Sequence, residues 1–398
     1  MSSTPPSELT QEALQAAFPH RLNLAVTGLE RIGGGKNSQV YKITLASDSA
    51  ANFDKSVGAA RCADLQPSTL NLHPGAFALK AYFRQANDQR DRLATEYNSF
   101  SHLWVNGFRQ IPQPLACDTT RGWAFYQFID GDKIPPGQAN DAQVLAAVDF
   151  LARLRELSRQ PESRNLGVAS EAYFVPRLMV ENLRRRLQHL QQETANQLAA
   201  IAKPHHASSS SDSTPYGALH DFLAAEFVPF LAEVTHWSEN RLTNAGMSFT
   251  EELDLPHRTL SPSDFGFHNA LRQPDGHIIF LDFEYFGWDD PAKMIADFLL
   301  HPAMNLSAAA KRTFASETFR RFADWPALVA RVESVYPLFG LKWCLIMLNE
   351  FLPDSYARRQ FAAATVVDRS SVLRQQLDKA RGMLERIRKE YREFPYRD

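Results

Sequence analysis

Three oxygen-bearing side chains lie in one short stretch of the chain, at a spacing that suits phosphoryl transfer. Asp264 and Asn269 are five positions apart, and Asp282 follows the largely apolar run 277–281. An aspartate can orient and deprotonate an attacking hydroxyl, while an amide and a second carboxylate can hold the Mg²⁺ that bridges nucleotide phosphates. The same residue types are common in turns, so a strand-turn-strand with solvated acids is the alternative interpretation.

A glycine cluster lies near the start of the chain, between two strand-like segments. Residues 29–46 read LERIGGGKNSQVYKITLA, which predicts two strands joined by a glycine-rich turn. Glycine lets backbone N–H groups approach phosphate oxygens without a side-chain clash. Such a turn is also often a plain hairpin. The candidate phosphate contacts are Gly33, Gly34, Gly35, Asn37 and Ser38.

A strand with one central lysine follows, and then a helix that carries a glutamate. In residues 76–83, AFALKAYF, the apolar side chains alternate onto one face, so Lys80 points to the other. Residues 88–103 repeat apolar positions at steps of three and four, which predicts an amphipathic helix. Glu96, sixteen positions after Lys80, lies beside that stripe and can pair with the ammonium. A solvated lysine and a solvated helix glutamate are the plain alternatives.

The order of these segments resembles the aminoglycoside phosphotransferase and choline kinase-like family, whose members are relatives of the protein kinases. The pattern of that family's catalytic and metal-binding loops is H-x-D-x4-N, then a strand, then D-F/W-E/D. The resemblance implies that Asp264 is the catalytic residue and that Asn269 and Asp282 bind Mg²⁺. It also implies that Lys80 clamps the phosphates of ATP, with Glu96 as its partner.

The chain departs from the family pattern at one position of the catalytic loop. Pro262 stands where the family has a histidine that braces the loop. Ser261, Ser263 and His268 are the candidates for a replacement.

The buried strand expected at 123–129 corresponds to the family's strand that leads into the hinge between two lobes. In the family, the hinge backbone pairs with adenine. The resemblance therefore assigns adenine contacts to the main chain of Gln127 and Ile129, although a plain core strand is the alternative.

The implied fold is α+β: a two-lobed protein-kinase-like fold with a small antiparallel β-sheet N-lobe and a mostly helical C-lobe. We expect an N-terminal tail and helix at 1–20, a nucleotide-binding N-lobe at 21–130, and a catalytic, acceptor-binding C-lobe at 131–398. We expect inserted loops at residues 47–75 and at the low-complexity segment 203–217.

Composition limits the classes of partner. Lys and Arg total 43 against 45 Asp and Glu, a net charge of −2, so no nucleic-acid partner is indicated. The sequence shows neither a secretory signal pattern nor an apolar run long enough to span a membrane. The three widely separated cysteines suit a reducing compartment, so we expect a cytoplasmic protein. The oligomeric state cannot be deduced from the sequence.

The predicted function is transfer of the γ-phosphate of ATP, with Mg²⁺, to a hydroxyl of a small molecule. Glu284 and Asp289 lie among aromatic residues and would make the acceptor side acidic, which suits an amino sugar or a choline-like amine. A neutral sugar remains open. One alternative is a kinase-like nucleotide-binding module with weakened catalysis. Another is a protein kinase, which the D-F-E sequence and the short segment before Asp290 disfavour.

Overall fold

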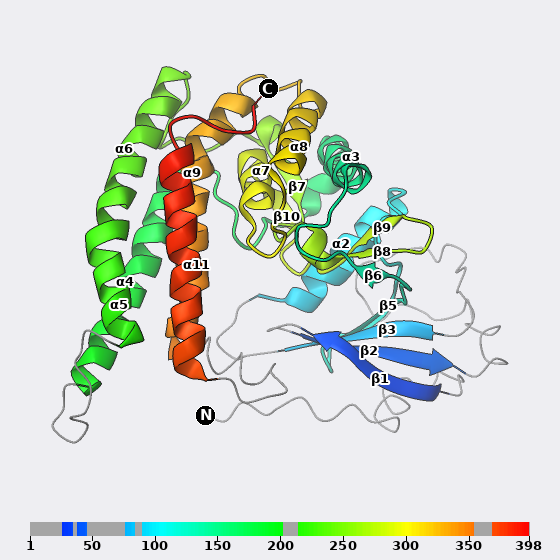
Figure 1. Cartoon of the computed structure of the whole chain (residues 1–398). Helices are drawn as coiled ribbons and strands as arrows, with labels where there is room; N and C mark the ends of the chain where they lie inside the picture. The colour runs from blue at the N-terminus through cyan, green and yellow to red at the C-terminus, as the bar shows by residue number, and fades with distance from the viewer. Residues whose placement is uncertain are drawn as a thin grey trace. The chain divides into compact units, whose positions relative to one another are not determined.

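The computed structural model of the 398-residue chain describes residues 26–34, 38–45, 76–83, 90–201, 214–353 and 368–397 (Figure 1). Several sequence predictions fall outside these residues: Gly35 and Asn37 of the expected phosphate loop, the tail at 1–20, the insert at 47–75 and most of the loop at 203–217.

The chain divides into two compact units. The N-terminal unit comprises the described residues of Met1–Ile134 together with Asn269–Phe286, and the C-terminal unit comprises Pro135–His268 and Gly287–Asp398. Asn269–Phe286 thus belongs to the N-terminal unit, whereas the sequence boundary at 130 assigned it to the second domain.

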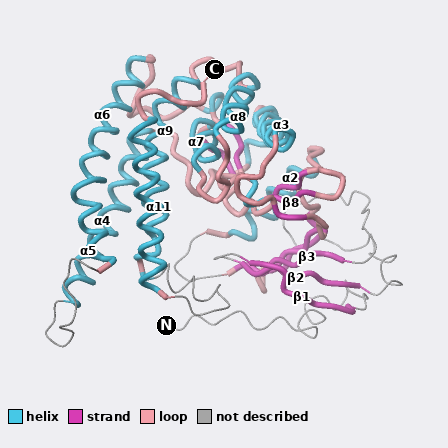
Figure 2. Tube along the Cα trace, in the orientation of Figure 1, coloured by secondary structure: helices cyan, strands magenta, loops and turns pink. Residues whose placement is uncertain are grey.

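A five-stranded antiparallel sheet forms most of the N-terminal unit (Figure 2). Alternation along the strands turns Ile43, Leu79 and Phe125 into one apolar cluster, and it directs Lys80 to the opposite face. In spatial order the strands are β1 (Val26–Gly34), β2 (Ser38–Leu45), β3 (Ala76–Tyr82), β5 (Trp123–Gln127) and β4 (Pro114–Asp118).

One helix and a second small sheet complete this unit. Helix α2 (Arg92–Val105) begins at Asp91, whose side chain accepts a hydrogen bond from the Ala94 N–H and so caps the helix. The second sheet orders its strands as β6 (Asp132–Lys133), β8 (Ala270–Arg272) and β9 (Ile278–Phe280).

The C-terminal unit is mostly helical, so the expected combination of a small antiparallel sheet and a mostly helical remainder is confirmed. Figures 1 and 2 show the long helices α9 and α11 side by side, and the two helices are in contact. The helices are α3 (Asp141–Ser158), α4 (Pro176–Ile201), α5 (Pro215–Asp221), the π-helical turn Phe222–Phe227, α6 (Val228–Asn244), α7 (Pro291–Leu300), α8 (Ala308–Arg321), α9 (Leu328–Met347) and α11 (Arg369–Glu390). Short 3₁₀ turns are formed by Pro161–Asn165, Leu255–His257, Phe267–Asn269 and Leu348–Phe351.

Two buried strands lie at the centre of this unit: β7 (Thr259–Ser261) pairs antiparallel with β10 (Gly287–Asp289). Gly287 is required here, because a Cβ would lie 2.5 Å from the backbone of Gly167 and Ala169. Strand β7 leads directly into Asp264, and β10 leads into α7. Among the described residues, no helix combines the length and apolarity that crossing a membrane requires.

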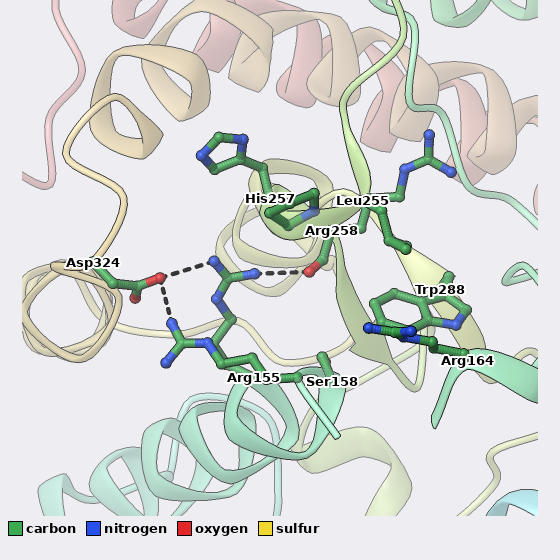
Figure 3. Close-up of a pocket in the computed structure, with 10 residues that line it drawn as sticks. Arg155, Ser158, Arg164, Leu255, His257, Arg258, Trp288 and Asp324 are labelled. Atoms are coloured by element: carbon green, nitrogen blue, oxygen red, sulfur yellow. Dashed lines mark hydrogen bonds and ion pairs between the residues drawn. The ribbon is translucent and has the colours of Figure 1, made fainter. Parts of the chain in front are cut away.

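A cavity of about 410 Å³ lies in the C-terminal unit, lined by residues of α3, of the segment 255–258 and of β10 (Figure 3). Asp264 is not among its lining residues.

Candidate active site

An ion cluster whose cation is the buried Lys80 brings together three of the predicted residues in the N-terminal unit. Lys80 Nζ lies 2.6 Å from Glu96 Oε2 and 2.5 Å from Asp282 Oδ1. Burial alone would lower the pKa of Lys80, but the carboxylates of Asp282 and Glu96 outweigh it and raise that pKa well above its ordinary value. Lys80 is therefore a fixed positive charge.

Glu96 is the centre of this cluster. Its Oε2 also accepts a hydrogen bond from the Tyr82 hydroxyl at 2.7 Å, and its Oε1 accepts one from the Phe283 N–H at 3.3 Å. Burial raises the pKa of Glu96 to about 6, although Lys80 and Tyr82 act in the opposite direction. One carboxylate thus connects β3, α2 and the segment that carries Asp282. Sequence reasoning missed Tyr82, although it lies two residues after Lys80 and so on the same strand face.

Asp282 and Asn269 carry oxygen donors of the kinds that hard cations prefer. The Leu281 N–H donates to the Asn269 carbonyl at 2.8 Å, which places the two candidate residues at the same end of the β8–β9 pair. Asp282 has a φ of 67°, a left-handed backbone that non-glycine residues adopt at a cost of about 1 kcal/mol or more. Its side chain is 40% exposed while one oxygen contacts Lys80, so the carboxylate stays accessible. An exposed carboxylate and an amide side chain from the same end of a strand pair are donor types that suit Mg²⁺, which keeps several waters when bound to proteins.

The expected nucleotide contacts are only partly described. Gly33 and Gly34 pair with Val40 and Gln39, so they lie where β1 turns into β2, and Ser38 begins β2. A Cβ on Gly33 would meet no atom within 4 Å of the described structure, so packing there does not require glycine.

The predicted adenine-binding segment lies at the end of β5. The Gln127 N–H donates to the Gln113 carbonyl at 2.8 Å, so this donor is already used within the protein. Adenine contacts by the main chain of Gln127 and Ile129 stay a prediction, in which the Gln127 N–H is not the group that contacts adenine in this conformation. Ile129 lies two residues beyond the strand and is buried.

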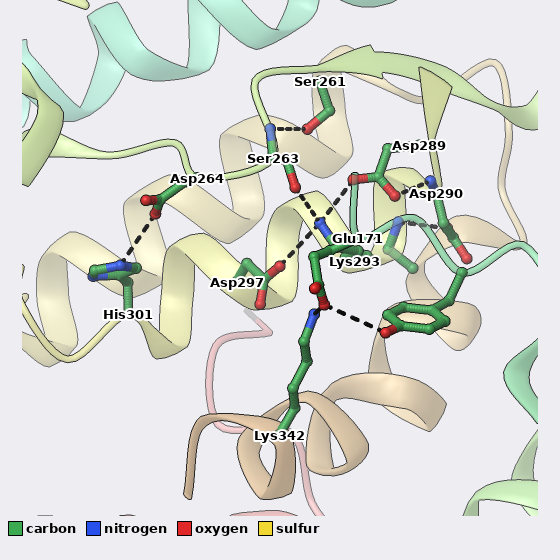
Figure 4. Close-up of polar contacts among 12 residues, drawn as sticks. Glu171, Ser261, Ser263, Asp264, Asp289, Asp290, Lys293, Asp297, His301 and Lys342 are labelled. Atoms are coloured by element: carbon green, nitrogen blue, oxygen red, sulfur yellow. Dashed lines mark hydrogen bonds and ion pairs between the residues drawn. The ribbon is translucent and has the colours of Figure 1, made fainter. Parts of the chain in front are cut away.

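Asp264 lies in the C-terminal unit and contacts two histidines. Its Oδ1 is 3.1 Å from His268 Nε2 and 3.3 Å from His301 Nε2. Figure 4 shows the contact with His301. Burial would raise the pKa of Asp264, but the hydrogen bonds from His268 and His301 outweigh it and hold that pKa well below its usual range. Asp264 is therefore a carboxylate at neutral pH.

The hydrogen bonds of His301 determine its tautomer. The Ala303 N–H donates to His301 Nδ1 at 3.3 Å, so Nε2 carries the proton that faces Asp264. His268 was a sequence candidate for the loop brace. His301 was not, because it lies 37 positions beyond Asp264 and no local pattern connects the two.

Asp264, His268 and His301 place three potential metal ligands within 4.8 Å of one another. However, the two imidazole rings are stacked, with centroids 3.8 Å apart and planes 9° from parallel. A metal ion binds imidazole nitrogen in the plane of the ring, and one ion cannot lie in two parallel planes. The arrangement therefore favours hydrogen bonding to Asp264 over a shared metal ion.

A second buried lysine holds the backbone just before Asp264. Lys293 Nζ lies 3.0 Å from Ser263 Oγ, 2.7 Å from Asp289 Oδ2 and 3.2 Å from Asp297 Oδ2 (Figure 4). Ser263 has a φ of 67°, and its N–H donates to Ser261 Oγ at 3.0 Å. Helix α7 thus anchors the turn that presents Asp264.

The two expected acceptor-side carboxylates are buried. Asp289 is 0% exposed and pairs with Lys293, and burial raises its pKa to about 6 although Lys293 lowers it. Glu284 is 4% exposed, and its Oε1 lies 3.7 Å from Arg92 Nε. This burial contradicts the expectation that the two side chains face an acceptor.

No model of a known protein family matches the sequence, and no curated protein matches it significantly. Solved structures do match. A spectinomycin phosphotransferase, solved with ADP and spectinomycin, has a TM-score of 0.57 at 12% identity, covering 96% of this chain and 100% of that one. An ethanolamine kinase of Plasmodium vivax has a TM-score of 0.51 at 11% identity, covering 95% and 91%. A choline kinase of Streptococcus pneumoniae has a TM-score of 0.50 at 12% identity, covering 94% and 99%.

At these identities the similarity establishes the fold. The chain has the protein-kinase-like fold that small-molecule kinases and phosphotransferases share, so the resemblance inferred from the sequence is confirmed at this level.

Proposed function

We propose that the protein is an ATP-dependent phosphotransferase that moves the γ-phosphate to a hydroxyl group of a small molecule. The observation that supports this most is the cluster of the buried Lys80 and Glu96 with the accessible Asp282. The ammonium of a buried lysine can bind a phosphate oxygen, and the accessible carboxylate of Asp282 beside it can bind the metal ion that accompanies the phosphates.

In this proposal Lys80 binds the phosphates of ATP, and Glu96 keeps its ammonium in position. Asn269 and Asp282 would hold Mg²⁺, which neutralises the charge of the phosphates during transfer. Gly33, Gly34 and Ser38 would line the phosphates from the β1–β2 turn.

Asp264 orients the acceptor hydroxyl and takes its proton as the oxygen attacks the γ-phosphorus. A carboxylate whose pKa is held low is anionic and can accept this hydrogen bond across the physiological pH range. His268 and His301 hold the carboxylate in place, a role that the family histidine would have at Pro262.

The acceptor is a small hydroxyl compound. Spectinomycin, ethanolamine and choline appear in the names of proteins with this fold, and all three carry amino groups and hydroxyls. Since Glu284 and Asp289 are buried, the case for a cationic acceptor now rests on these names, and neutral sugars belong in the same test.

Incubation with γ-labelled ATP and Mg²⁺ tests the proposal. The panel comprises aminoglycosides, spectinomycin, choline, ethanolamine, neutral sugars and a generic protein substrate. We expect label in one small-molecule class and none in protein. Label in protein alone would indicate a protein kinase, and nucleotide binding without any transfer would indicate a binding module.

The Asp264→Asn variant identifies the catalytic residue. We expect it to lower kcat about 10²-fold to 10⁴-fold, the usual contribution of general base catalysis, with little change in the Kd for ATP. Full turnover by this variant would show that Asp264 is not the base.

A further inference from the structure

A basic pocket lies in the C-terminal unit, and its lining includes none of the residues assigned to phosphoryl transfer. It is the cavity of about 410 Å³ shown in Figure 3. Four of its lining residues are arginines and only one is a carboxylate. The residues that matter here are Arg155, Arg159, Arg164, Arg258, Asp324 and Trp288.

One carboxylate, Asp324, forms ion pairs with two of the arginines. Asp324 Oδ2 lies 2.9 Å from Arg155 Nη2 and also pairs with Arg159. Arg155 is only 4% exposed, and its buried Nε has no hydrogen-bond partner among the described residues. Its Nη1 donates to the Arg258 carbonyl at 2.7 Å (Figure 3). The buried guanidinium of Arg155 thus shares its one carboxylate with Arg159 and keeps one N–H without a partner among the described residues.

The rim contributes further positive charge. Arg164 is exposed, lies beside Trp288 in Figure 3, and forms no hydrogen bond or ion pair with any described residue. Arg159 is 52% exposed, so its guanidinium can also reach a ligand. Arg258 is less available, because its Nη2 pairs with Glu252 at 2.6 Å.

The pocket therefore has an excess of positive charge. Four arginines and Asp324 give a formal charge of +3, and Glu252, the partner of Arg258, reduces it to +2. His257 also lines the pocket and pairs with the exposed carboxylate of Asp254. With His257 counted as neutral, the negative charge of Asp254 lowers the formal charge of the pocket to +1. A phosphate monoester carries about −1.5 to −2 at neutral pH, which complements this excess.

We propose that the basic pocket binds the phosphate group of a phosphorylated small molecule. The forks of Arg159 and Arg164 grip the phosphate oxygens, since guanidinium geometry matches phosphate. The apolar part of the ligand lies against Trp288, whose indole N–H is already used by the Ser163 carbonyl at 3.2 Å. The site is independent of the proposed phosphotransferase function.

Isothermal titration calorimetry of the full-length protein at low salt tests this directly, with phenyl phosphate, inorganic phosphate and benzoate as probes. We expect saturable one-to-one binding of phenyl phosphate, weaker binding of inorganic phosphate because it lacks a ring for Trp288, and the weakest binding for the singly charged benzoate. Arg159→Gln and Arg164→Gln should each weaken phenyl phosphate binding about fivefold, as partly exposed charge-assisted contacts do. Asp324→Asn should tighten it, because the variant removes the competing carboxylate.

Arg185→Gln is the matched control. Arg185 is an exposed arginine of α4 that does not line the pocket, so this variant makes the same change in net charge and should leave binding unchanged. Thermal unfolding of every variant checks that it is folded. The assignment is overturned by absence of saturable binding, by equal binding of benzoate and phenyl phosphate, or by full binding in the Arg159→Gln/Arg164→Gln double variant. Equal weakening in Arg185→Gln would also overturn it, because the effect would then be one of overall charge.

Discussion

Removal of the Lys80 ammonium should destabilise the protein, and removal of the Glu96 charge should then restore much of the loss. In Lys80→Met, the Glu96 carboxylate stays 2% exposed and keeps only its hydrogen bonds from Tyr82 and Phe283. Loss of one partner of a buried ion pair costs about 3–5 kcal/mol, and protonation of Glu96 limits the loss to the lower end of that range.

The double variant isolates the pair. Glutamine at position 96 keeps the size of glutamate and carries no charge, so Lys80→Met/Glu96→Gln should be about 2 kcal/mol more stable than Lys80→Met. Loss of Lys80 leaves the Asp282 carboxylate unpaired at a smaller cost than Glu96, because its side chain is 40% exposed and water screens its charge.

Urea unfolding of the wild type, both single variants and the double variant gives the four free energies of the cycle. The reasoning is refuted if Glu96→Gln destabilises the Lys80→Met protein as much as it destabilises the wild type, since the two residues would then act independently. ATP binding should be lost in both proteins that lack Lys80, whatever their stability.

Two further predictions follow from the same contacts. The pKa of Glu96 is raised from 4.5 to about 6 in the folded protein, so its contribution to stability is fully present below pH 4.5 and is lost as the pH rises through 6. This shift corresponds to about 2 kcal/mol of unfolding free energy. Urea unfolding at several pH values should show the loss in the wild type but not in Glu96→Gln. At the catalytic loop, His301→Leu should lower kcat about 10-fold to 100-fold, the range seen when residues that orient metal ligands are replaced. His301→Gln keeps an N–H donor for Asp264 and should retain most of the activity. KM should be unchanged in both variants. Equal kcat values for the leucine and glutamine variants would contradict the orienting role of His301.

Local periodicity was enough to predict where two of the candidate residues, Lys80 and Glu96, lie on their elements. Alternation in β3 determines the face on which Lys80 lies, and the stripe of α2 determines the face that buries Glu96. Their order along the chain then matches a known fold, and the structure brings both residues to Asp282.

The residues that the sequence missed depend on contacts between distant segments. His301 reaches Asp264 from the end of α7, and nothing in the pattern around either residue specifies that contact. The prediction for Asp289 failed for a different reason. Acidic composition says nothing about burial. Asp289 ends strand β10, and its carboxylate is buried with Lys293 of α7 as its ion-pair partner.

Each of the two units has a buried lysine in contact with a residue of left-handed backbone at or next to a candidate functional side chain. Asp282 and Ser263 both have a φ of 67°, a conformation that persists only where surrounding contacts determine it. In each case a buried lysine makes such a contact: Lys80 to the Asp282 carboxylate at 2.5 Å, and Lys293 to the Ser263 hydroxyl at 3.0 Å. A lysine that is enclosed and compensated by carboxylates cannot move to solvent at low cost, so each one fixes a strained turn at the place where a candidate functional side chain is presented.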